Sequence, residues 1–301
     1  MPSLLDMTDV PMTNILEKCT YKSVLTLRKV CHSLRNFIDD SCFKTDLDDI
    51  RINIGPTGFS VRCYNAFRTD RMGFSKYSTS NDLKITIKMA QNSKLSYFSV
   101  KTNSDNAEGL DDLEDILKNQ TRLLQTEHFE MEGSEILKVL PYLDSKTLKK
   151  ISIRPANYKT GDHKLYGIEK VMELEQFKNA VELYINAWFV VRADVRKFFH
   201  FQTVSVNLHE TSLEELVALK EAFITSSHMN SFILVDFKLN VNQLEQVFGT
   251  PFDGPRHHPG QQWFFKIRNC KKYVLRIVFL TVLRFCKWES EKVPQDAVVQ
   301  N

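Results

Sequence analysis

From residue 95 onward, six short segments repeat one apolar pattern, and this repetition limits what the chain can fold into. In each segment the fourth and sixth residues of a hexad are apolar, and the first usually is too. The hexads are Leu95-Phe98-Val100, Thr126-Phe129-Met131, Leu148-Ile151-Ile153, Ala180-Leu183-Ile185, Phe201-Val204-Val206 and Met229-Phe232-Leu234. Successive fourth positions lie 31, 22, 32, 21 and 28 residues apart. Such alternation indicates short strands, and such intervals indicate a repeated structural unit.

The stretches between the hexads have the pattern of helices. One of them places four apolar residues on a single helical face: Leu110, Leu113, Ile116 and Leu117. Ser212 with Glu215 forms a capping box, and Asn242 with Glu245 indicates a second helix start, with Gly249 as its end. Alternating strands and helices predict parallel strands with helices packed against them. The interval lengths are close to those of a leucine-rich repeat, although they are uneven.

The residues that alternate with the apolar hexad positions are nearly all polar. They are Tyr97, Ser99, Lys101, His128, Glu130, Glu132, Lys150, Ser152, Arg154, Glu182, Tyr184, Asn186, Thr203, Ser205 and Asn207. Strands buried on both faces would be apolar throughout. We therefore expect one face of the sheet to be exposed, as in a horseshoe whose helices cover only the convex side. Ile233 and Val235 break the rule, and we expect strands over 263–268 and 273–280 to cover them.

The first 43 residues have the pattern of short helices. Thr8 or Asp9 can cap the first, and Thr20 can cap the next. The helix after Thr20 is predicted to carry five apolar residues at spacings of three and four: Val24, Leu27, Cys31, Leu34 and Ile38. A unit of about 40 residues rarely folds alone. These helices should therefore dock on the rest of the chain or on a partner.

The fold that these patterns predict is α/β, with four consecutive parts. Helices over 1–43 are followed by a connecting β hairpin and loop over 44–93. The hairpin strands, 47–54 and 59–64, flank the turn sequence Gly-Pro-Thr-Gly. Residues 94–290 form an irregular leucine-rich-repeat-like strand-helix array that ends in a β hairpin, and 291–301 form a tail.

Common catalytic motifs are missing from the sequence. There is no G-x-G-x-x-G, G-x-x-x-x-G-K-[ST], H-E-x-x-H or G-x-S-x-G. The pair His257-His258 has no second ligand pair at metal-site spacing, so we expect a solvated loop there. The net charge of +3 gives no reason to expect a polyanion partner. We expect a protein that is not an enzyme, with no metal, no cofactor and no nucleic-acid partner.

The six cysteines and the chain ends indicate a reducing compartment. None of the cysteines forms a C-x-x-C pair, and the first residues have neither a basic region nor an apolar run. The apolar stretch 273–288 contains Arg276, Arg284 and Lys287, and it is too short and too charged to span a bilayer. We therefore expect free thiols, no membrane partner, and a cytoplasmic and/or nuclear location.

The N-terminal segment resembles the F-box. The resemblance is carried by Met7-Thr8-Asp9-Val10-Pro11, by Ile15-Leu16, and by the run from Val24 to Arg35 that contains Val30-Cys31-His32. F-boxes have a Leu-Pro start, an Ile-Leu pair seven residues on, and a Val-Cys segment in their second half. The chain departs from this pattern at Thr8, where proline is usual, at Pro11, where an aliphatic residue is usual, and at Cys19, where leucine is usual.

The rest of the chain resembles the FTH domain, the partner domain of the large nematode-type F-box family. Four segments carry this resemblance: Leu143 to Leu148, Glu175 to Ala180, Phe201 to Val204 and Trp263 to Ile267. Together the two resemblances cover most of the chain. They imply a substrate-recognition subunit of a Skp-cullin-F-box ubiquitin ligase.

In such a subunit the N-terminal helices bind a Skp-type adaptor and, through it, a cullin. The residues expected to contact the adaptor are Met7, Thr8, Val10, Pro11, Ile15, Leu16, Leu25, Leu27, Val30, Cys31 and Leu34. Among them, Leu16, Val30, Cys31 and Leu34 are expected on helical apolar faces. A receptor of this kind acts through proximity and needs no nucleophile of its own.

A protein substrate would bind the C-terminal domain. We expect it on the polar strand face, at Tyr97, Glu130, Glu132, Lys150, Arg154, Tyr184, Asn186 and Asn207. Aromatic residues and arginine tend to carry the binding energy of protein interfaces. The alternative surface is the C-terminal hairpin with the loop over 251–262. The alternative function is a non-catalytic leucine-rich-repeat-like scaffold without a ubiquitin role, in which the N-terminal helices only cap the repeats.

Overall fold

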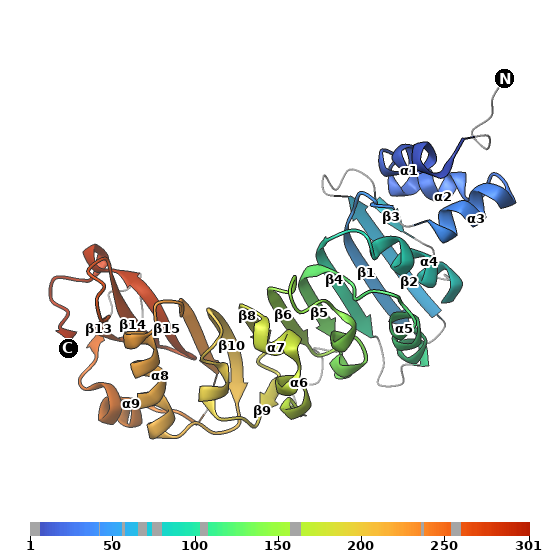
Figure 1. Cartoon of the computed structure of the whole chain (residues 1–301). Helices are drawn as coiled ribbons and strands as arrows, with labels where there is room; N and C mark the ends of the chain where they lie inside the picture. The colour runs from blue at the N-terminus through green and yellow to red at the C-terminus, as the bar shows by residue number, and fades with distance from the viewer. Residues whose placement is uncertain are drawn as a thin grey trace. The chain divides into compact units, whose positions relative to one another are not determined.

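The computed structural model is a mixed α/β fold with helices at its N-terminus and strands in both parallel and antiparallel pairing (Figure 1). It describes residues 7–41, 43–55, 58–65, 71–73, 80–102, 108–156, 164–235, 238–253 and 260–301. The chain divides into two compact units, Met1–Lys149 and Lys150–Asn301. We call them the N-terminal unit and the C-terminal unit and describe each by itself.

The N-terminal unit begins with α1 (Asp9–Glu17), α2 (Tyr21–Leu27) and α3 (His32–Asp40). Thr20 caps α2 as expected, because its hydroxyl accepts a hydrogen bond from the Ser23 backbone N–H at 3.2 Å. The prediction of a single helix from Thr20 through Ile38 is wrong. The chain leaves the helix after Arg28, and Cys31 has an extended backbone and caps α3 by accepting from the Leu34 N–H.

The apolar spacing continued across this break because both helices face the same interior. Val24 of α2 is buried, and so are Leu34 and Ile38 of α3. A bidentate ion pair joins the two helices, with the Arg28 guanidinium 2.7 and 2.8 Å from the Asp39 carboxylate oxygens. Periodicity alone therefore cannot distinguish one long helix from two short helices that share a core.

A five-stranded arrangement follows in the N-terminal unit, in the order β3-β2-β1-β4-β5. The strands are β1 (Leu47–Gly55), β2 (Gly58–Asn65), β3 (Arg71–Gly73), β4 (Leu95–Thr102) and β5 (Thr126–Glu132). The predicted hairpin is confirmed, since β1 and β2 are antiparallel and Gly55 is paired with Gly58. Residues 56 and 57 of its turn lie outside the described residues. Strand β4 runs parallel to β1, and β5 runs parallel to β4.

Two helices, α4 (Ser80–Ala90) and α5 (Glu108–Lys118), cover one face of these strands (Figure 1). The four apolar residues predicted for α5 are all buried. Gly109 allows α5 to approach β1 closely, because a Cβ there would lie 2.8 Å from the Ile54 side chain. Helix α4 was not predicted. The short 3₁₀ turns η2 (Ile136–Lys138) and η3 (Leu140–Tyr142) follow β5.

The C-terminal unit continues the strand-helix alternation with parallel strands. These are β6 (Lys150–Arg154), β8 (Glu182–Ile185), β10 (Thr203–Leu208) and β11 (Ser231–Val235). All six hexads therefore coincide with strands, and their fourth and sixth residues are all buried. The connecting helical elements are α6 (Glu169–Glu173), α7 (Glu175–Asn179), η4 (Val195–Phe198), α8 (Leu213–Thr225) and α9 (Val241–Phe248). The leucine-rich-repeat-like character of this array stays a prediction.

The two predicted starts of α8 and α9 had different outcomes. The capping box of Ser212 and Glu215 is confirmed at α8. Helix α9 is instead capped two residues earlier than expected, by a box of Asn240 and Gln243. The predicted end at Gly249 is confirmed, and its φ of 80° lies in the region that favours glycine.

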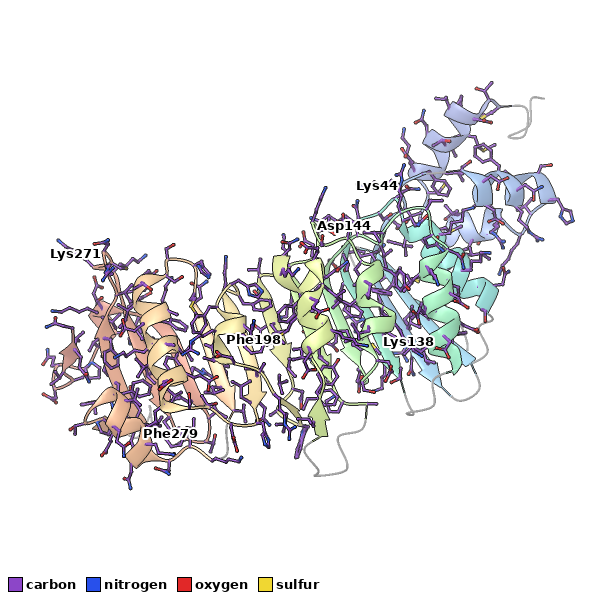
Figure 2. All side chains as sticks on the ribbon, turned by 60° about the horizontal axis from the view of Figure 1, so that its bottom comes forward. Lys44, Lys138, Asp144, Phe198, Lys271 and Phe279 are labelled. Atoms are coloured by element: carbon purple, nitrogen blue, oxygen red, sulfur yellow. The ribbon has the colours of Figure 1, made fainter. Side chains whose placement is uncertain are left out.

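The C-terminal unit ends in antiparallel strands: β12 (Phe252–Asp253), β13 (Gln261–Lys266), β14 (Tyr273–Phe279) and β15 (Leu283–Glu289). Figure 2 shows Lys271 and Phe279 near the two ends of β14. The expected hairpin of β13 and β14 is confirmed, whereas β15 was not predicted as a separate strand. The expectation that these strands cover Ile233 and Val235 is wrong. Strand β15 instead pairs edge to edge with β11, with Ile233 beside Arg284.

Three short strands complete the C-terminal unit. Strand β7 (Lys164–Tyr166) pairs with β9 (Phe189–Val191), and β9 pairs with the end of β10. Strand β16 (Val299–Gln300) pairs with β13, and the 3₁₀ turn η5 (Ser290–Lys292) precedes it. The last residues are thus partly built into the sheet, although they were expected to be a tail. The other domain boundaries drawn from the sequence stay predictions.

Candidate functional site

The residues expected to contact an adaptor differ widely in exposure. Met7, Val10 and Val30 are large apolar side chains, and they are 46%, 71% and 65% exposed. Thr8 and Pro11 are also exposed, Ile15, Leu25, Leu27 and Cys31 are half-buried, and Leu16 and Leu34 are buried. The buried pair belongs to the interior of the helices, and the exposed residues remain free for a partner.

Val30 does not lie where the sequence placed it. It was expected on a helical apolar face, but it lies in the turn between α2 and α3. Its backbone N–H donates to the Leu27 carbonyl, which closes the turn and leaves the side chain exposed. Cys31 also leaves the expected stripe, because it caps α3.

In the N-terminal unit, the face opposite α4 and α5 carries a cluster of aromatic and charged side chains. Tyr97 of β4 meets His128 of β5 edge to face, with ring centroids 4.8 Å apart. The guanidinium of Arg51 lies 5.0 Å from the Tyr97 ring and 5.2 Å from the Tyr64 ring. Arg51 also pairs with the buried Asp49 carboxylate at 2.6 Å.

Tyr97 and its neighbours match the expected polar face. Burial, and next the charge of Glu130, raise the pKa of Tyr97 to about 12, so its hydroxyl stays neutral and can donate a hydrogen bond. Glu132 accepts from the Lys101 ammonium at 2.6 Å. Arg51 and Tyr64 were missed as members of this face. The signal for Arg51 was the alternation of polar residues with Ile50, Ile52 and Ile54, and the signal for Tyr64 was the same alternation in the other strand of the predicted hairpin, 59–64.

In the C-terminal unit, the remaining expected residues lie on β6, β8 and β10 and in the loop that follows β8. Lys150 places its ammonium 4.2 Å from the Tyr184 ring centroid and 3.6 Å from the Glu182 carboxylate. Arg154 is exposed at the end of β6. Asn186 accepts a hydrogen bond from the Trp188 backbone N–H, so it shapes the loop that follows β8.

Asn207 was expected on the exposed face, and this placement is wrong. It is 1% exposed, and its amide donates to the Ala187 carbonyl at 2.6 Å. Strand β9 continues the sheet beside the end of β10, with Val190 paired to Asn207. The side chain is therefore enclosed and joins β10 to the loop after β8. A joint surface of all eight predicted substrate residues stays a prediction.

Comparison with known families decides what the helices are. Residues 4–46, which include α1, α2 and α3, match the family model for the F-box domain. Residues 107–252, from α5 to β12, match the family model for the FTH domain. The chain carries an F-box domain and an FTH domain. No curated protein and no solved structure matches the chain.

These two domains define a coarse role. An F-box implies binding of a Skp-type adaptor and, through it, assembly with a cullin in a ubiquitin ligase. The FTH domain is compatible with substrate recognition. Domains of both kinds are typically non-catalytic binding modules.

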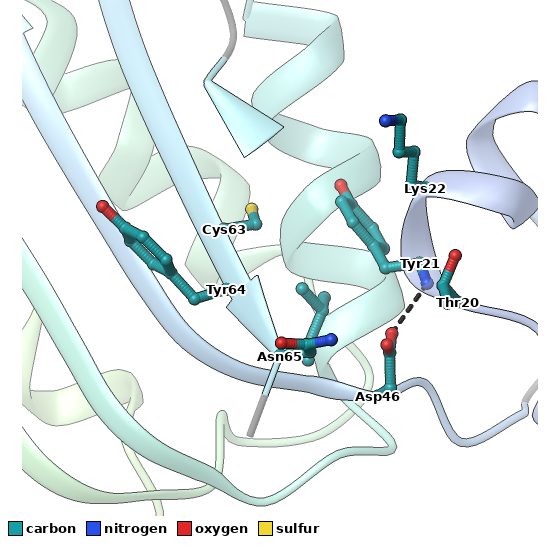
Figure 3. A pocket seen from close by; sticks show the side chains of 8 residues that line it. Thr20, Tyr21, Lys22, Asp46, Cys63, Tyr64 and Asn65 are labelled. Carbon is teal, nitrogen blue, oxygen red and sulfur yellow. Dashed lines mark hydrogen bonds between the residues drawn. The ribbon is translucent and has the colours of Figure 1, made fainter. Parts of the chain in front are cut away.

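The F-box is joined to the strands of the N-terminal unit through Tyr21, the first residue of α2 (Figure 3). The Tyr21 ring is buried, and its hydroxyl lies 3.0 Å from the Thr86 hydroxyl of α4. Its backbone N–H donates to the Asp46 carboxylate at 2.7 Å, drawn as the dashed line in Figure 3. Cys63 of β2 lies beside this ring. The F-box therefore has a polar contact with α4 through Thr86 and a side-chain contact with β2 through Cys63.

Burial determines the protonation of this junction. It raises the pKa of the Tyr21 phenol and raises the pKa of the Cys63 thiol to about 12. Both groups are neutral at physiological pH. A buried neutral thiol is unreactive, so Cys63 is a packing residue.

No group of three or more histidine, cysteine, aspartate or glutamate side chains among the described residues could hold a metal ion. None of the described helices is long and apolar enough to cross a membrane. The pair His257-His258, expected in a solvated loop, lies outside the described residues.

Proposed function

We propose that this protein is a substrate-recognition subunit of a Skp-cullin-F-box ubiquitin ligase. The single observation that supports this most is the exposure of Met7 just before α1, of Val10 in α1 and of Val30 in the turn between α2 and α3, in a domain whose helices already have a buried interior. Burying one such side chain against a partner stabilises a complex by roughly 1.5–3 kcal/mol. Apolar side chains left exposed in this number, on a domain of the F-box family, suit adaptor binding.

The substrate would bind the exposed strand faces of the region that includes the FTH domain. In the N-terminal unit that face is the cluster of Tyr64, Arg51, Tyr97 and His128, and in the C-terminal unit it includes Lys150, Arg154 and Tyr184. Aromatic and arginine side chains are enriched at the centres of protein interfaces. We infer a leucine-rich-repeat-like array that presents these residues to a folded or extended protein, in the cytoplasm or nucleus.

Co-purification of the full-length chain with a Skp-type adaptor tests this proposal. We expect a stable complex with the wild-type chain. The Val30→Asp variant should lose the complex, because the new carboxylate would be buried unpaired against the adaptor. Val298 is also an exposed valine, at 77%, and it lies far along the chain outside both family matches. Val298→Asp is therefore the matched control and should bind normally.

A second function has one observation in its favour. Tyr21 and Thr86 attach α2 to α4, as expected if the helices serve as a cap for a leucine-rich-repeat-like scaffold without a ubiquitin role. The same experiment separates the two functions. Failure of the wild-type chain to bind the adaptor, or normal binding by Val30→Asp, would favour the scaffold.

A further inference from the structure

Positive charge is concentrated in the last part of the chain. Residues 260–301 contain eight lysine and arginine residues but only three aspartate and glutamate residues, whereas the whole chain has 40 and 37. This segment forms β13, β14 and β15 and lies beyond the residues that match the FTH domain. The excess charge is therefore a feature of this sheet and not of the chain as a whole.

Arg276 lies in the middle of β14, on the face turned away from α8 and α9. Phe223 of α8 stacks on Phe285 of β15, and Phe248 of α9 packs on Trp263 of β13, so these rings mark the helix-covered face. Across the sheet, Arg276 is paired with Phe264 of β13 and with Cys286 of β15. These two residues directly follow Trp263 and Phe285 in the sequence. Because side chains alternate along strands, Arg276 points to the other face.

The Arg276 side chain is largely enclosed. It is 9% exposed, its Nε donates to the Gln262 side-chain oxygen at 2.9 Å, and its guanidinium lies 4.2 Å from the Trp288 ring centroid. Both contacts are with uncharged groups. The remaining guanidinium N–H groups are directed by these two contacts into a fixed orientation.

No carboxylate of the described residues lies within ion-pair distance of Arg276. The less buried Arg28 and Arg196 have carboxylate partners at 2.7 and 2.8 Å. Burying a guanidinium without a counter-charge is unfavourable, and buried charges in proteins are normally paired. Burial first, and the charge of Arg284 as well, lower the pKa of Arg276. Two like charges thus lie on one face without an acid between them.

We propose that this face binds an acidic segment of a protein, with one carboxylate accepting hydrogen bonds from the Arg276 guanidinium. We call Arg276, Gln262, Trp288 and Arg284 the Arg276 site. The inference rests on the proposed function only in taking the bound protein to be a substrate of the ligase. Binding of its acidic segment does not need the adaptor.

The geometry favours a carboxylate of a protein over other anions. A planar carboxylate matches the fork of a single guanidinium, and its single charge balances the one largely buried cation. A phosphate dianion would need a second buried cation, and Arg284 is exposed. A nucleic acid would use aromatic faces for base stacking, whereas Arg276 already occupies one face of Trp288.

The test measures binding of a fluorescein-labelled hexaglutamate peptide to the purified full-length chain by anisotropy at low salt. We expect saturable binding that Arg276→Gln weakens by about ten- to a hundredfold, the range for a hydrogen bond to a charged group. Arg276→Lys keeps the charge but not the fork, so its affinity should lie between the two. Arg196→Gln removes the same charge from an exposed ion pair and should bind as the wild type does.

Thermal melting identifies which variants fold. If Arg276→Gln does not fold, the proposal is tested by comparing the peptide affinity of Arg276→Lys with that of Arg196→Gln. Equal affinity of the folded Arg276 variants and Arg196→Gln would overturn the proposal. Tighter, Arg276-dependent binding of a phosphoserine peptide or of an oligodeoxythymidine would also overturn it, because the ligand would then not be a carboxylate segment.

The outcome is separable from that of the proposed function. Peptide binding at the Arg276 site without adaptor binding would refute only the ligase role. Adaptor binding without Arg276-dependent peptide binding would refute only the inference.

Discussion

The Tyr21 hydroxyl lies 3.0 Å from the Thr86 hydroxyl, and this buried contact joins the second helix of the F-box to a helix that covers the sheet. Thr86 also donates to the Asp82 carbonyl within α4. The pair therefore forms a short chain of hydrogen bonds that neither the F-box nor the sheet contains alone.

The energy of this contact can be measured by a double-mutant cycle with Tyr21→Phe and Thr86→Val. A neutral buried hydrogen bond contributes about 1 kcal/mol, so we expect each change to destabilise the chain and the pair to be coupled by about that amount. Urea unfolding of the four chains provides the values. Strictly additive losses would mean that the two hydroxyls do not interact.

The junction should make stability depend on alkaline pH. Burial raises the pKa of Cys63 from 9.0 to about 12. The folded chain thus holds this proton more tightly than the unfolded chain. The resulting stability is complete below pH 9 and is lost as pH rises from about 9 to about 12, by up to about 1.4 kcal/mol per pH unit. Cys63→Ala should reduce this slope in urea unfolding between pH 8 and 10, and an unchanged slope would contradict the assignment.

Leu16 and Val30 should respond differently to aspartate. Leu16 is buried within the F-box, so Leu16→Asp should destabilise the free protein by several kcal/mol. Val30 is exposed, so Val30→Asp should change the stability by no more than about 0.5 kcal/mol while abolishing adaptor binding. Thermal melting with an adaptor binding assay on each variant checks both statements. An unstable Val30→Asp chain would show that this valine packs within the protein.

The two threonines that precede helices should differ in importance. Thr20 caps α2, so Thr20→Ala should cost about 1 kcal/mol. Within the described residues the Thr8 side chain makes no capping hydrogen bond, so Thr8→Ala should be neutral. Thr8→Pro should keep or improve adaptor affinity, because the Thr8 φ of −72° suits proline. A clear loss of affinity would mean that Thr8 itself contacts the adaptor.

The exposed strand faces can be tested with a triple variant, Glu130→Ala, Arg154→Ala and Tyr184→Ala. None of these residues is buried, so the variant should fold and should lose proteins that the F-box-deleted chain captures. A matched triple variant, Glu221→Ala, Arg196→Ala and Tyr273→Ala, removes the same side-chain types elsewhere and should capture the same proteins as before. An unchanged capture list from the first variant would exclude these faces as the substrate site.

Much of the strand arrangement could be predicted because a strand with one exposed face leaves a two-residue period. The six hexads located six strands and their buried residues correctly. Strand β15 was missed because its apolar residues continue those of β14 with only a short turn between them. Helix α4 was missed because Leu83, Ile85, Ile87 and Met89 recur at every second residue, which is the period of a strand, although Ser80 and Asp82 are residue types that begin helices.

The errors at single residues have local causes. Asn207 was misplaced because alternation predicts which face a side chain points to, but not whether a later strand such as β9 encloses that position. Cys31 and Val30 were misplaced because the apolar periodicity does not show a break between two helices when both helices face the same interior. The absence of a partner for Arg276 was not visible at all, since it depends on which strands become neighbours.

The Tyr21 junction has a consequence for where a bound substrate would be held. Since the F-box is attached to α4 and not merely tethered, the distance from an adaptor to the strands of the N-terminal unit is determined by the fold. Neighbouring strands lie about 4.8 Å apart, so a residue on β5 lies about 10 Å further across the sheet than its counterpart on β1. The same peptide would therefore be held at a different distance from the adaptor on each strand. The strand that it binds would then determine which lysines of the bound protein face the ubiquitin-carrying enzyme.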